Sequence, residues 1–249
     1  MTDPVIFTEN LTKKYKGSEE EALRGINMLI RKGEFFGLLG PNAAGKSTLI
    51  AILCGINRQT SGELIVFGRK DTFRDDQIKK RIGLVPQEIA LYPSLTVLEN
   101  LEFFGRLHGL STYTLKIKID ECISIFNLGE HRNKLISKCS GGIKRRVNLF
   151  AGVMHDPDLI LLDEPTLGVD AQLRSVIFDY VSQLNKNGTT ILYTTHYMKE
   201  AEMLCSKVNI IDHGLIIREG TPQELIQSEP GCTDLGQLFL QLTGRDLRD

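Results

Sequence analysis

The spacing of apolar residues changes along the chain and predicts different elements in different parts. Residues 4–39 hold three short apolar or alternating segments, VIFTENL, LRGINMLI and FFGLL, which predict strands. TSGELIVFG (60–68) predicts a turn and a strand, and IGLVPQE (82–88) predicts another strand. From about residue 89 to residue 156 the apolar positions take helical spacing, as in TVLENLEFFGRLHGL (96–110). A helical region therefore interrupts a β-rich one.

Two continuous apolar runs follow the helical region. DLILLDEP (158–165) and GTTILYTTH (188–196) are typical of parallel strands that are buried on both faces. The segment between them, AQLRSVIFDYVSQLNK, has helical spacing, and this alternation predicts an α/β fold with a mostly parallel core sheet. NIIDHGLIIREG (209–220) predicts a hairpin, and the last thirty residues predict a helix and a loose tail.

Residues that cap or stop helices mark boundaries within the helical region. Gly109 and Ser111 separate its first two helices, and Ser140 can cap the next one. Pro157 stops that helix because proline lacks the backbone N–H that a helix interior needs.

Composition and charge limit the classes of protein to consider. Of the 249 residues, 41 % are hydrophobic and 24 % are charged, which is ordinary for a soluble domain with a sizeable core. The formal net charge is −1, so the chain shows no basic footprint and we expect no nucleic-acid partner. MTDPVIFTEN has no signal-peptide pattern, and the apolar run LIAILCGI is shorter than the ~18 residues of a membrane span. We expect a cytoplasmic chain that meets a membrane only through a partner.

Candidate chemistry begins at GPNAAGKST (40–48), which has the G-x-x-x-x-G-K-[ST] spacing of a phosphate-binding loop. The apolar run EFFGLL precedes it and the helical pattern KSTLIAILCGI follows, so the loop joins a strand to a helix start, as this motif requires. The free N–H groups and the dipole of a helix N-terminus attract an anion. Lys46 can reach the outer phosphates, and the Ser47 hydroxyl can bind Mg²⁺. The alternative is a glycine-rich turn that binds nothing.

A pair of carboxylates forms a second candidate site. LILLDEP places Asp163 and Glu164 at the carboxyl end of a buried strand, the edge where parallel α/β sheets bind ligands. Asp163 can hold Mg²⁺, often through water, and Glu164 can act as general base on an attacking water. The alternative is a solvated turn, but the apolar run before the pair and the phosphate-binding loop upstream favour a site.

His196 and Gln87 end two other predicted strands. His196 lies at the same predicted edge, where its imidazole can contact a γ-phosphate or position Glu164. Taken alone, such a histidine is more often a plain strand-end residue. The Gln87 amide can touch the metal ion or its water, although one glutamine is a weak signal by itself.

As a set, GPNAAGKST, VPQ, CSGG, LILLDEP, LGVD and TTH, in this order and spacing, resemble the ATP-binding subunit of an ABC transporter. The resemblance runs from Tyr15 to about Leu225, and SGGIKRRVNLFAG, LGVDAQLR and TTHYMKEAEMLC are most similar to the subfamily that drives export permeases for drugs, antibiotics or polysaccharides. It implies a P-loop NTPase with an N-terminal antiparallel β subdomain and a helical subdomain inserted at about 89–156. The ABC ATPase domain would cover residues 1–228, and residues 229–249 would form a C-terminal helix or tail.

The resemblance also implies roles for individual positions. Tyr15 would stack on adenine, unless it is an ordinary exposed tyrosine, and the loop would wrap the phosphates. The implied ATP-binding residues are Tyr15, Gly40, Pro41, Asn42, Ala43, Ala44, Gly45, Lys46, Ser47 and Thr48; the implied catalytic residues are Glu164, His196 and Gln87; and the implied Mg²⁺ residues are Ser47, Gln87 and Asp163. Ser140, Gly141 and Gly142 would act in trans on the γ-phosphate held by a second subunit, and Asp170 would lie at the dimer interface.

Two positions depart from the family pattern. Ala43 stands where the family often has glycine, and a positive φ there would cost alanine about 1 kcal/mol. Ile143 stands where the signature usually has glutamine, which puts in doubt only a contact to the nucleotide sugar. We expect the loop to bind ATP in spite of both changes.

The implied function is an ATPase subunit that dimerises on ATP and powers a separate integral membrane permease for export. Its cofactors would be ATP and Mg²⁺, and its second subunit would be a copy of itself or a sister ATPase. Its location would be the inner face of the cell membrane. A non-transport ABC ATPase, in translation, DNA repair or cofactor assembly, is the alternative, although the sequence has neither the second ATPase unit nor the basic surface of many such proteins. A nucleotide sensor without turnover is a third possibility, which Glu164 and His196 argue against.

Overall fold

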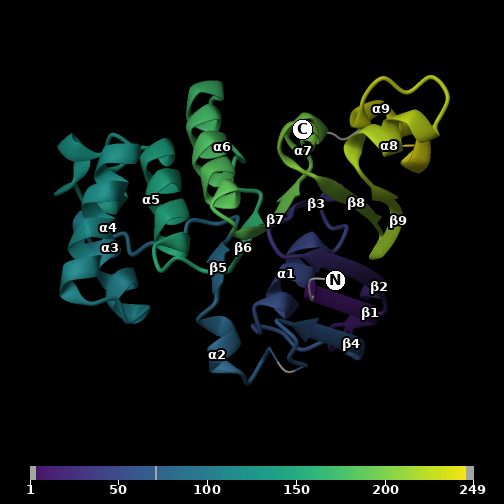
Figure 1. Ribbon diagram of the computed structural model, residues 1–249, viewed down its shortest axis with the longest axis horizontal. Helices are drawn as coiled ribbons and strands as arrows, with labels where there is room; N and C mark the ends of the chain where they lie inside the picture. Colours follow the sequence, from purple (N-terminus) through teal and green to yellow (C-terminus); the bar gives the residue numbers. More distant parts are fainter. Residues whose placement is uncertain (1–3, 71, 245–249) are drawn as a thin grey trace.

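The chain folds around two β-sheets, seen in a computed structural model that describes residues 4–70 and 72–244 (Figure 1). The antiparallel sheet has three strands in the order β2-β1-β4. The core sheet has six strands in the order β5-β6-β7-β3-β8-β9, and only β9 runs antiparallel to its neighbour. The strands are β1 (Pro4–Lys14), β2 (Glu21–Arg31), β3 (Phe35–Leu39), β4 (Ser61–Val66), β5 (Ile82–Val85), β6 (Leu159–Asp163), β7 (Thr190–Thr195), β8 (Lys207–Asp212) and β9 (Leu215–Gly220). The predicted α/β fold with a mostly parallel core and an N-terminal antiparallel sheet is confirmed.

The helices fall into three groups around these sheets. In Figure 1 one group stands at one end of the molecule, where the sequence predicts the helical insertion: α3 (Val97–Leu107), α4 (Thr112–Ile125) and α5 (Gly141–Val153), with the short 3₁₀ turns η1 (Gly129–His131) and η2 (Ile136–Lys138). The second group consists of α1 (Lys46–Leu53) and the short α2 (Asp76–Lys79). The remaining helices share only their place in the sequence, after β6: α6 (Ala171–Lys186), α7 (Met198–Leu204), α8 (Pro222–Ser228) and α9 (Leu235–Thr243).

The core sheet is buried on both faces, which explains its continuous apolar runs. On β3, Phe35 packs into one core cluster and Phe36 into the other. Ile160 and Leu161 divide in the same way on β6. One cluster joins the sheet to α3, α4, α5 and α6, and the other joins it to α1 and the antiparallel sheet. The strands β3, β6 and β7 are therefore buried along their whole length, whereas the edge strand β9 is at least partly exposed throughout.

The predicted caps lie where the helices begin. The Ser140 side chain accepts a hydrogen bond from the Ile143 amide at 3.4 Å, and Ser111 caps α4 in the same way. Gly109 separates α3 from α4 with a φ of 78°, and α5 ends at Val153, before Pro157. The hairpin of β8 and β9 turns at His213 and Gly214, as the sequence predicts.

The structure differs from the sequence prediction at two places. β5 ends at Val85 rather than continuing to residue 88, because Pro86 supplies no N–H to a strand ladder. The last thirty residues hold two helices, α8 and α9, where the sequence predicts one helix and a loose tail. Helix α9 buries Leu235, Leu238 and Phe239 in the larger core cluster, so tertiary packing orders it. The boundary at residue 228 stays a prediction.

No helix within residues 4–70 and 72–244 has both the length and the apolar content that crossing a bilayer requires.

Candidate functional site

The loop between β3 and α1 has the tight backbone that its glycines predict. Gly45 has a φ of 110°, and a Cβ there would lie 2.7 Å from the Ala22 carbonyl oxygen. A Cβ on Gly40 would lie 2.2 Å from the Ile211 carbonyl oxygen. Only glycine fits at these two positions. Ala43 has a φ of 64°, so the alanine does adopt the left-handed conformation that disfavours it.

A pocket of about 420 Å³ opens over this loop. Its lining residues are Ala22, Asn42, Ala43, Ala44, Gly45, Lys46, Ser47, Thr48, Gln87 and Glu164. The structure therefore brings together most of the loop, the glutamine after β5 and the glutamate after β6. Ala22, from β2, is the one lining residue that the sequence does not predict as part of the site.

Three buried charged or ionisable side chains form a continuous chain beside this pocket. The Lys46 ammonium lies 3.0 Å from Glu164 Oε1 and donates to the carbonyl oxygens of Gly40 and Pro41 at 2.8 and 3.0 Å. The other carboxylate oxygen of Glu164 lies 2.9 Å from His196 Nδ1. Lys46, Glu164 and His196 are only 4 %, 5 % and 7 % exposed, so each depends on the others to compensate for lost hydration.

Asp163 and Glu164 are oriented by β7, the neighbouring strand. Thr194 Oγ1 donates to Asp163 Oδ1 at 2.6 Å and accepts from the Glu164 amide at 3.1 Å. Glu164 has a φ of 47°, an unfavourable value for a non-glycine residue. The strained backbone turns the Glu164 side chain toward Lys46, whereas Asp163 lies outside the lining of the pocket. Thr194 is thus a positioning residue that its strand pattern does not reveal.

The pocket fits a nucleotide phosphate chain and its magnesium ion. Helix α1 begins at Lys46 without a side-chain cap from the described residues, so its first N–H groups are available to an anion. Within the described chain, no three His, Cys, Asp or Glu side chains gather as a metal site. Mg²⁺ in nucleotide sites commonly takes one or two protein ligands beside phosphate oxygens and water, and Ser47, Gln87 and Asp163 offer such oxygens.

Tyr15 lies next to the loop rather than inside the pocket. Its hydroxyl donates to Thr48 Oγ1 at 3.4 Å and accepts from Asn57 Nδ2 at 3.2 Å. The residue is 40 % exposed, and the Lys13 ammonium lies over its ring, 5.0 Å from the centroid. The structure therefore places Tyr15 beside the last residue of the predicted phosphate loop.

The signature residues and Asp170 lie apart from this pocket but close to each other. Ser140 and Asp170 are exposed N-caps of α5 and α6. A Cβ on Gly142 would meet a Leu173 methyl group at 3.0 Å, so the first turns of these two helices touch. The two predicted interface elements thus share one surface of the chain.

The buried Arg145 is a connection that the sequence does not predict. It lies on α5, is 7 % exposed and donates to the carbonyl oxygens of Gln87 at 2.8 Å and Leu167 at 3.3 Å. The guanidinium therefore links the helix of the signature to the segments that carry the glutamine and Asp170. In sequence it stands in the run KRR, which looks like an ordinary solvated face, so no local signal marks it.

Glu200 on α7 is a second such residue. Its buried carboxylate accepts hydrogen bonds from Thr166 at 2.8 Å, Tyr193 at 2.8 Å and Thr195 at 2.9 Å. Arg174 Nε lies 3.5 Å away. Burial, and then this carboxylate, raise the pKa of Tyr193 well above its usual value, so the phenol remains a donor. Glu200 ties the segment after Glu164 to the strand that leads to His196.

Comparison with known families gives one long match. The family model described as "ABC transporter" matches residues 23–167, which is more than half of the chain. The Linearmycin resistance ATP-binding protein LnrL of Bacillus subtilis is 44 % identical over 240 residues, which are 96 % of this chain and 75 % of that protein. The Nod factor export ATP-binding protein I of Ralstonia nicotianae is 38 % identical over 92 % of this chain and 71 % of that protein.

Solved structures agree with these relatives. An ATP-binding subunit of an ABC transporter has a TM-score of 0.87 at 24 % identity, over 96 % of this chain and 99 % of that one, which shows the shared fold. The ATP-binding cassette MJ0796, solved as a dimer in a post-hydrolysis state with ADP and Pi, has a TM-score of 0.80 at 29 % identity, over 87 % of this chain and 98 % of that one.

Proposed function

The chain belongs to the ABC transporter family as an ATP-hydrolysing subunit, and we propose that it pairs head to tail with a second copy on binding ATP and drives export through a separate membrane permease. The observation that carries this proposal is the buried chain of Lys46, Glu164 and His196 beside the phosphate-binding loop. It supplies a cation for phosphate oxygens and a carboxylate that a histidine holds in place.

The three side chains divide the work of hydrolysis. Lys46 moves its ammonium from Glu164 to the outer phosphates, which releases Glu164 Oε1 to accept a proton from the attacking water. His196 Nδ1 keeps the other carboxylate oxygen in place and offers the far side of its ring to the γ-phosphate. Ser47, Gln87 and Asp163 would hold Mg²⁺, which would supply positive charge to neutralise the phosphates when bound. Tyr15 stacks its exposed ring on adenine.

The surface that carries Ser140, Gly141, Gly142 and Asp170 forms the other half of each nucleotide site. The contact between Gly142 and Leu173 supports this proposal because it presents the signature and Asp170 together. The N-terminus of α5 then points its N–H groups and the Ser140 hydroxyl at the γ-phosphate of the partner copy.

An exposed aromatic cluster supports a permease contact on the helical region. Tyr92 and Phe103 are 47 % and 38 % exposed, with ring centroids 4.7 Å apart, and Phe104 lies 5.3 Å from Phe103. Exposed apolar clusters of this kind often mark protein interfaces. Arg145, bonded to the Gln87 carbonyl, lies on the same helical region and offers a route from the nucleotide to the permease. We place the chain on the inner face of the membrane through this contact.

The proposed organisation is a single ATPase domain over residues 1–228, with the helical subdomain at about 89–156 and a C-terminal segment at 229–249. The names of the relatives, a linearmycin resistance protein and Nod factor export proteins, support export rather than a role in translation, DNA repair or cofactor assembly. The permease, rather than this chain, selects the cargo.

The test uses Glu164→Gln, which removes the general base but keeps the shape of the side chain. We expect this variant to form a stable dimer with saturating ATP-Mg²⁺, measured by light scattering. Gly141→Asp provides a matched control, because a Cβ at Gly141 meets no atom within 4 Å in the chain's own fold. The double variant should bind ATP with unchanged affinity and stay monomeric. A monomeric Glu164→Gln variant at saturating ATP-Mg²⁺ would contradict the proposal.

A further inference from the structure

One end of the outer face of the antiparallel sheet is unexpectedly apolar. Ile6 and Thr8 on β1 face the core with 0 % and 2 % exposure, as strand alternation requires. Phe7 therefore points to the other face, where Ile65 of β4 lies directly opposite it. An antiparallel sheet with one solvated face normally carries polar residues there. Here the outward pair Phe7 and Ile65 is apolar, whereas the next outward pair along the same two strands is Glu9 and Glu63.

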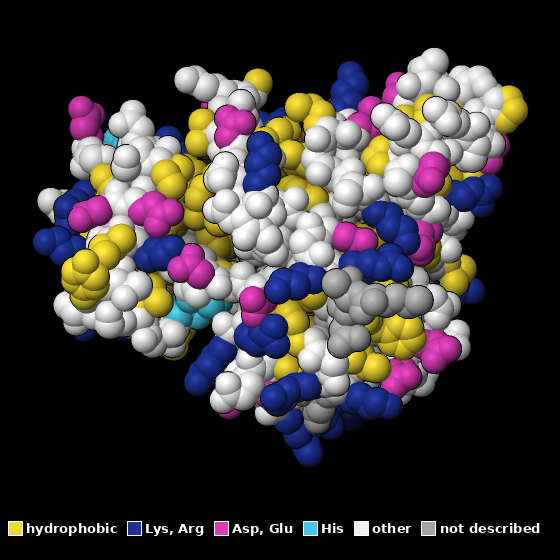
Figure 2. All heavy atoms as spheres, in the orientation of Figure 1, with side chains coloured by type: hydrophobic (Ala, Val, Ile, Leu, Met, Phe, Trp, Pro, Cys, Tyr) yellow, Lys and Arg dark blue, Asp and Glu magenta, His cyan; other side chains and the backbone are white. Residues whose placement is uncertain are grey.

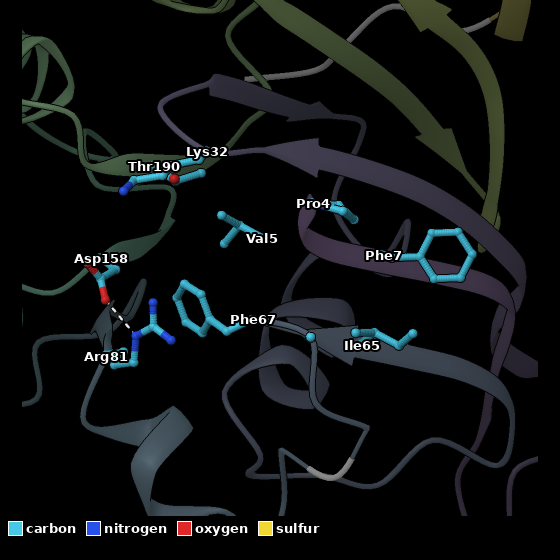
Figure 3. A pocket seen from close by; sticks show the side chains of 10 residues that line it. Pro4, Val5, Phe7, Lys32, Ile65, Phe67, Arg81, Asp158 and Thr190 are labelled. Atoms are coloured by element: carbon cyan, nitrogen blue, oxygen red, sulfur yellow. Dashed lines mark hydrogen bonds and ion pairs between the residues drawn. The ribbon is translucent and has the colours of Figure 1, made fainter. Parts of the chain in front are cut away.

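These side chains form one wall of a pocket of about 570 Å³ (Figure 3). Figure 3 shows Val5 and Phe67 on one side of it, together with Arg81 and Asp158. Figure 2 shows apolar side chains among lysine and arginine side chains over this part of the molecule. Its volume is within the usual range for small-molecule sites, which are apolar with a few convergent polar groups.

The pocket lies on the opposite edge of the core sheet from the nucleotide site. Arg81 and Asp158 immediately precede β5 and β6, and Lys32 precedes β3. These are the amino ends of parallel strands, whereas the phosphate-binding loop follows the carboxyl end of β3. The two pockets therefore have no lining residue in common, and a ligand of one does not compete for space in the other.

Phe67 is held in this pocket at a conformational cost. It has a φ of 51° and Gly68 has a φ of 75°, in a tight turn closed by pairing of Val66 with Arg69. Such turns favour asparagine or glycine, and an aromatic residue with a positive φ is an outlier. Strained residues of this kind tend to occur at binding sites. The ring is covered by the Arg81 guanidinium, 3.8 Å from its centroid.

The charges at the rim leave a positive excess. Arg81 donates through Nε to Asp158 at 2.6 Å, which leaves its terminal amino groups for another acceptor. The Lys32 ammonium makes no ion pair with the described residues. One carboxylate therefore faces two cations, next to aromatic and aliphatic walls.

We propose that this pocket is a second ligand site, which binds a small organic anion with an aromatic or alkyl body. The body would lie against Phe7, Ile65 and Phe67, and its carboxylate, sulfonate or phosphate would face Lys32 and Arg81. The proposal does not depend on the transport function, because no residue of the nucleotide site takes part.

The first test titrates the full chain with the fluorescent probe anilinonaphthalene sulfonate in saturating ATP-Mg²⁺. Phe67→Asn removes the ring and gives the turn its favoured residue, so the variant keeps its fold, which thermal unfolding checks. We expect about a tenfold loss of probe affinity. The matched control Tyr113→Asn, at an exposed aromatic residue outside both the pocket and the aromatic cluster of Tyr92 and Phe103, should leave affinity unchanged. Unchanged binding by a folded Phe67→Asn variant would overturn the proposal, and so would a probe that binds the chain without ATP but not in saturating ATP-Mg²⁺.

The second test separates the charge from the apolar wall. Lys32→Glu should weaken the sulfonate probe about tenfold, less at high salt, and leave the neutral probe phenylnaphthylamine unchanged. Equal loss for both probes, or no loss for the sulfonate, would show that the pocket does not select anions.

Discussion

The two edges of the core sheet carry charged side chains in different environments. At the carboxyl edge Lys46 and Glu164 are 4 % and 5 % exposed, and each makes short contacts with the other and with neighbours. At the amino edge the side chains of Arg81 and Asp158 are 48 % and 51 % exposed. A buried charge costs much free energy when its partner is removed, whereas water screens an exposed pair. Chemistry therefore concentrates at the first edge, and the second is suited to reversible binding.

The largest expected effect is at Lys46. In Lys46→Ala the phosphates lose their cation and Glu164 keeps a buried charge with one partner fewer, so ATP affinity should fall at least about 100-fold, or about 3 kcal/mol. Titration calorimetry measures this, with the exposed Lys186→Ala as control. Affinity close to that of the unchanged chain would remove the energetic distinction between the two edges.

The next effect is at Glu200, which shares the carboxyl edge. Glu200→Gln replaces a carboxylate that accepts three side-chain hydrogen bonds by an amide that cannot accept them all. We expect a loss of about 2–3 kcal/mol in the free energy of unfolding, together with slower ATP turnover, because Thr166 and Thr195 would lose their anchor. Urea denaturation and phosphate release measure the two effects. The exposed Glu130→Gln should change stability by less than about 0.5 kcal/mol, and a loss no larger in Glu200→Gln would contradict the assignment.

His155 gives a smaller, pH-dependent effect beneath the amino edge, where its Nε2 lies 3.2 Å from the Ile82 carbonyl oxygen. Burial, and then the stacked His108, lower the pKa of His155 from 6.5 to about 4, although Asp156 acts in the opposite direction. Between these two values the unfolded chain binds a proton that the folded chain does not, so stability falls as the pH drops from about 6.5 to about 4.

The variant His155→Gln should recover about 1–2 kcal/mol of this pH dependence, because the ring is only partly buried and solvent screens it. Denaturation at a series of pH values measures the effect, with His131→Gln as control. Parallel curves for His155→Gln and the unchanged chain would show that the histidine takes up its proton equally in the folded and unfolded states.

The smallest effect is at Ala43, the counterpart of Phe67 at the carboxyl edge. Ala43→Gly relieves a φ of 64° and should stabilise the chain by up to about 1 kcal/mol. Ala44→Gly, a buried neighbour without a positive φ, should destabilise it by about 1 kcal/mol. Thermal unfolding of both variants tests the contrast, and equal shifts would mean that the conformation of Ala43 carries no strain.

Local sequence signals predicted the parts of the fold that depend on local chemistry. LILLD predicted a buried strand because four of its five residues are aliphatic, and TILYTT because its residues are β-branched, aromatic or aliphatic. Ser140 predicted a helix start because its hydroxyl can cap one. The sequence predicted one helix in the last thirty residues rather than both α8 and α9, because the order of α9 comes from burying Leu238 and Phe239 against distant elements.

The candidate site also has residues that local sequence predicts and residues that only distant contacts reveal. The spacing of GPNAAGKST and the position of Asp163 and Glu164 after an apolar run were sufficient to propose a nucleotide site. Arg145 and Glu200 were not predicted, because each has the sequence context of an exposed helical charge. The structure distinguishes Arg145, which is buried and donates to the Gln87 and Leu167 carbonyls, from its less buried neighbour Arg146, which donates to the Phe126 carbonyl.

The sequence by itself determined the order of strands and helices, the phosphate-binding loop and the family, because each depends on residue type at short spacing. Only the tertiary structure decided that Glu164 lies between Lys46 and His196, and that Lys32, Phe67 and Arg81 surround one pocket at the opposite edge. Those contacts join residues from different elements of the fold. Their distances follow from the order of the strands within the sheet and from packing, which no local pattern encodes.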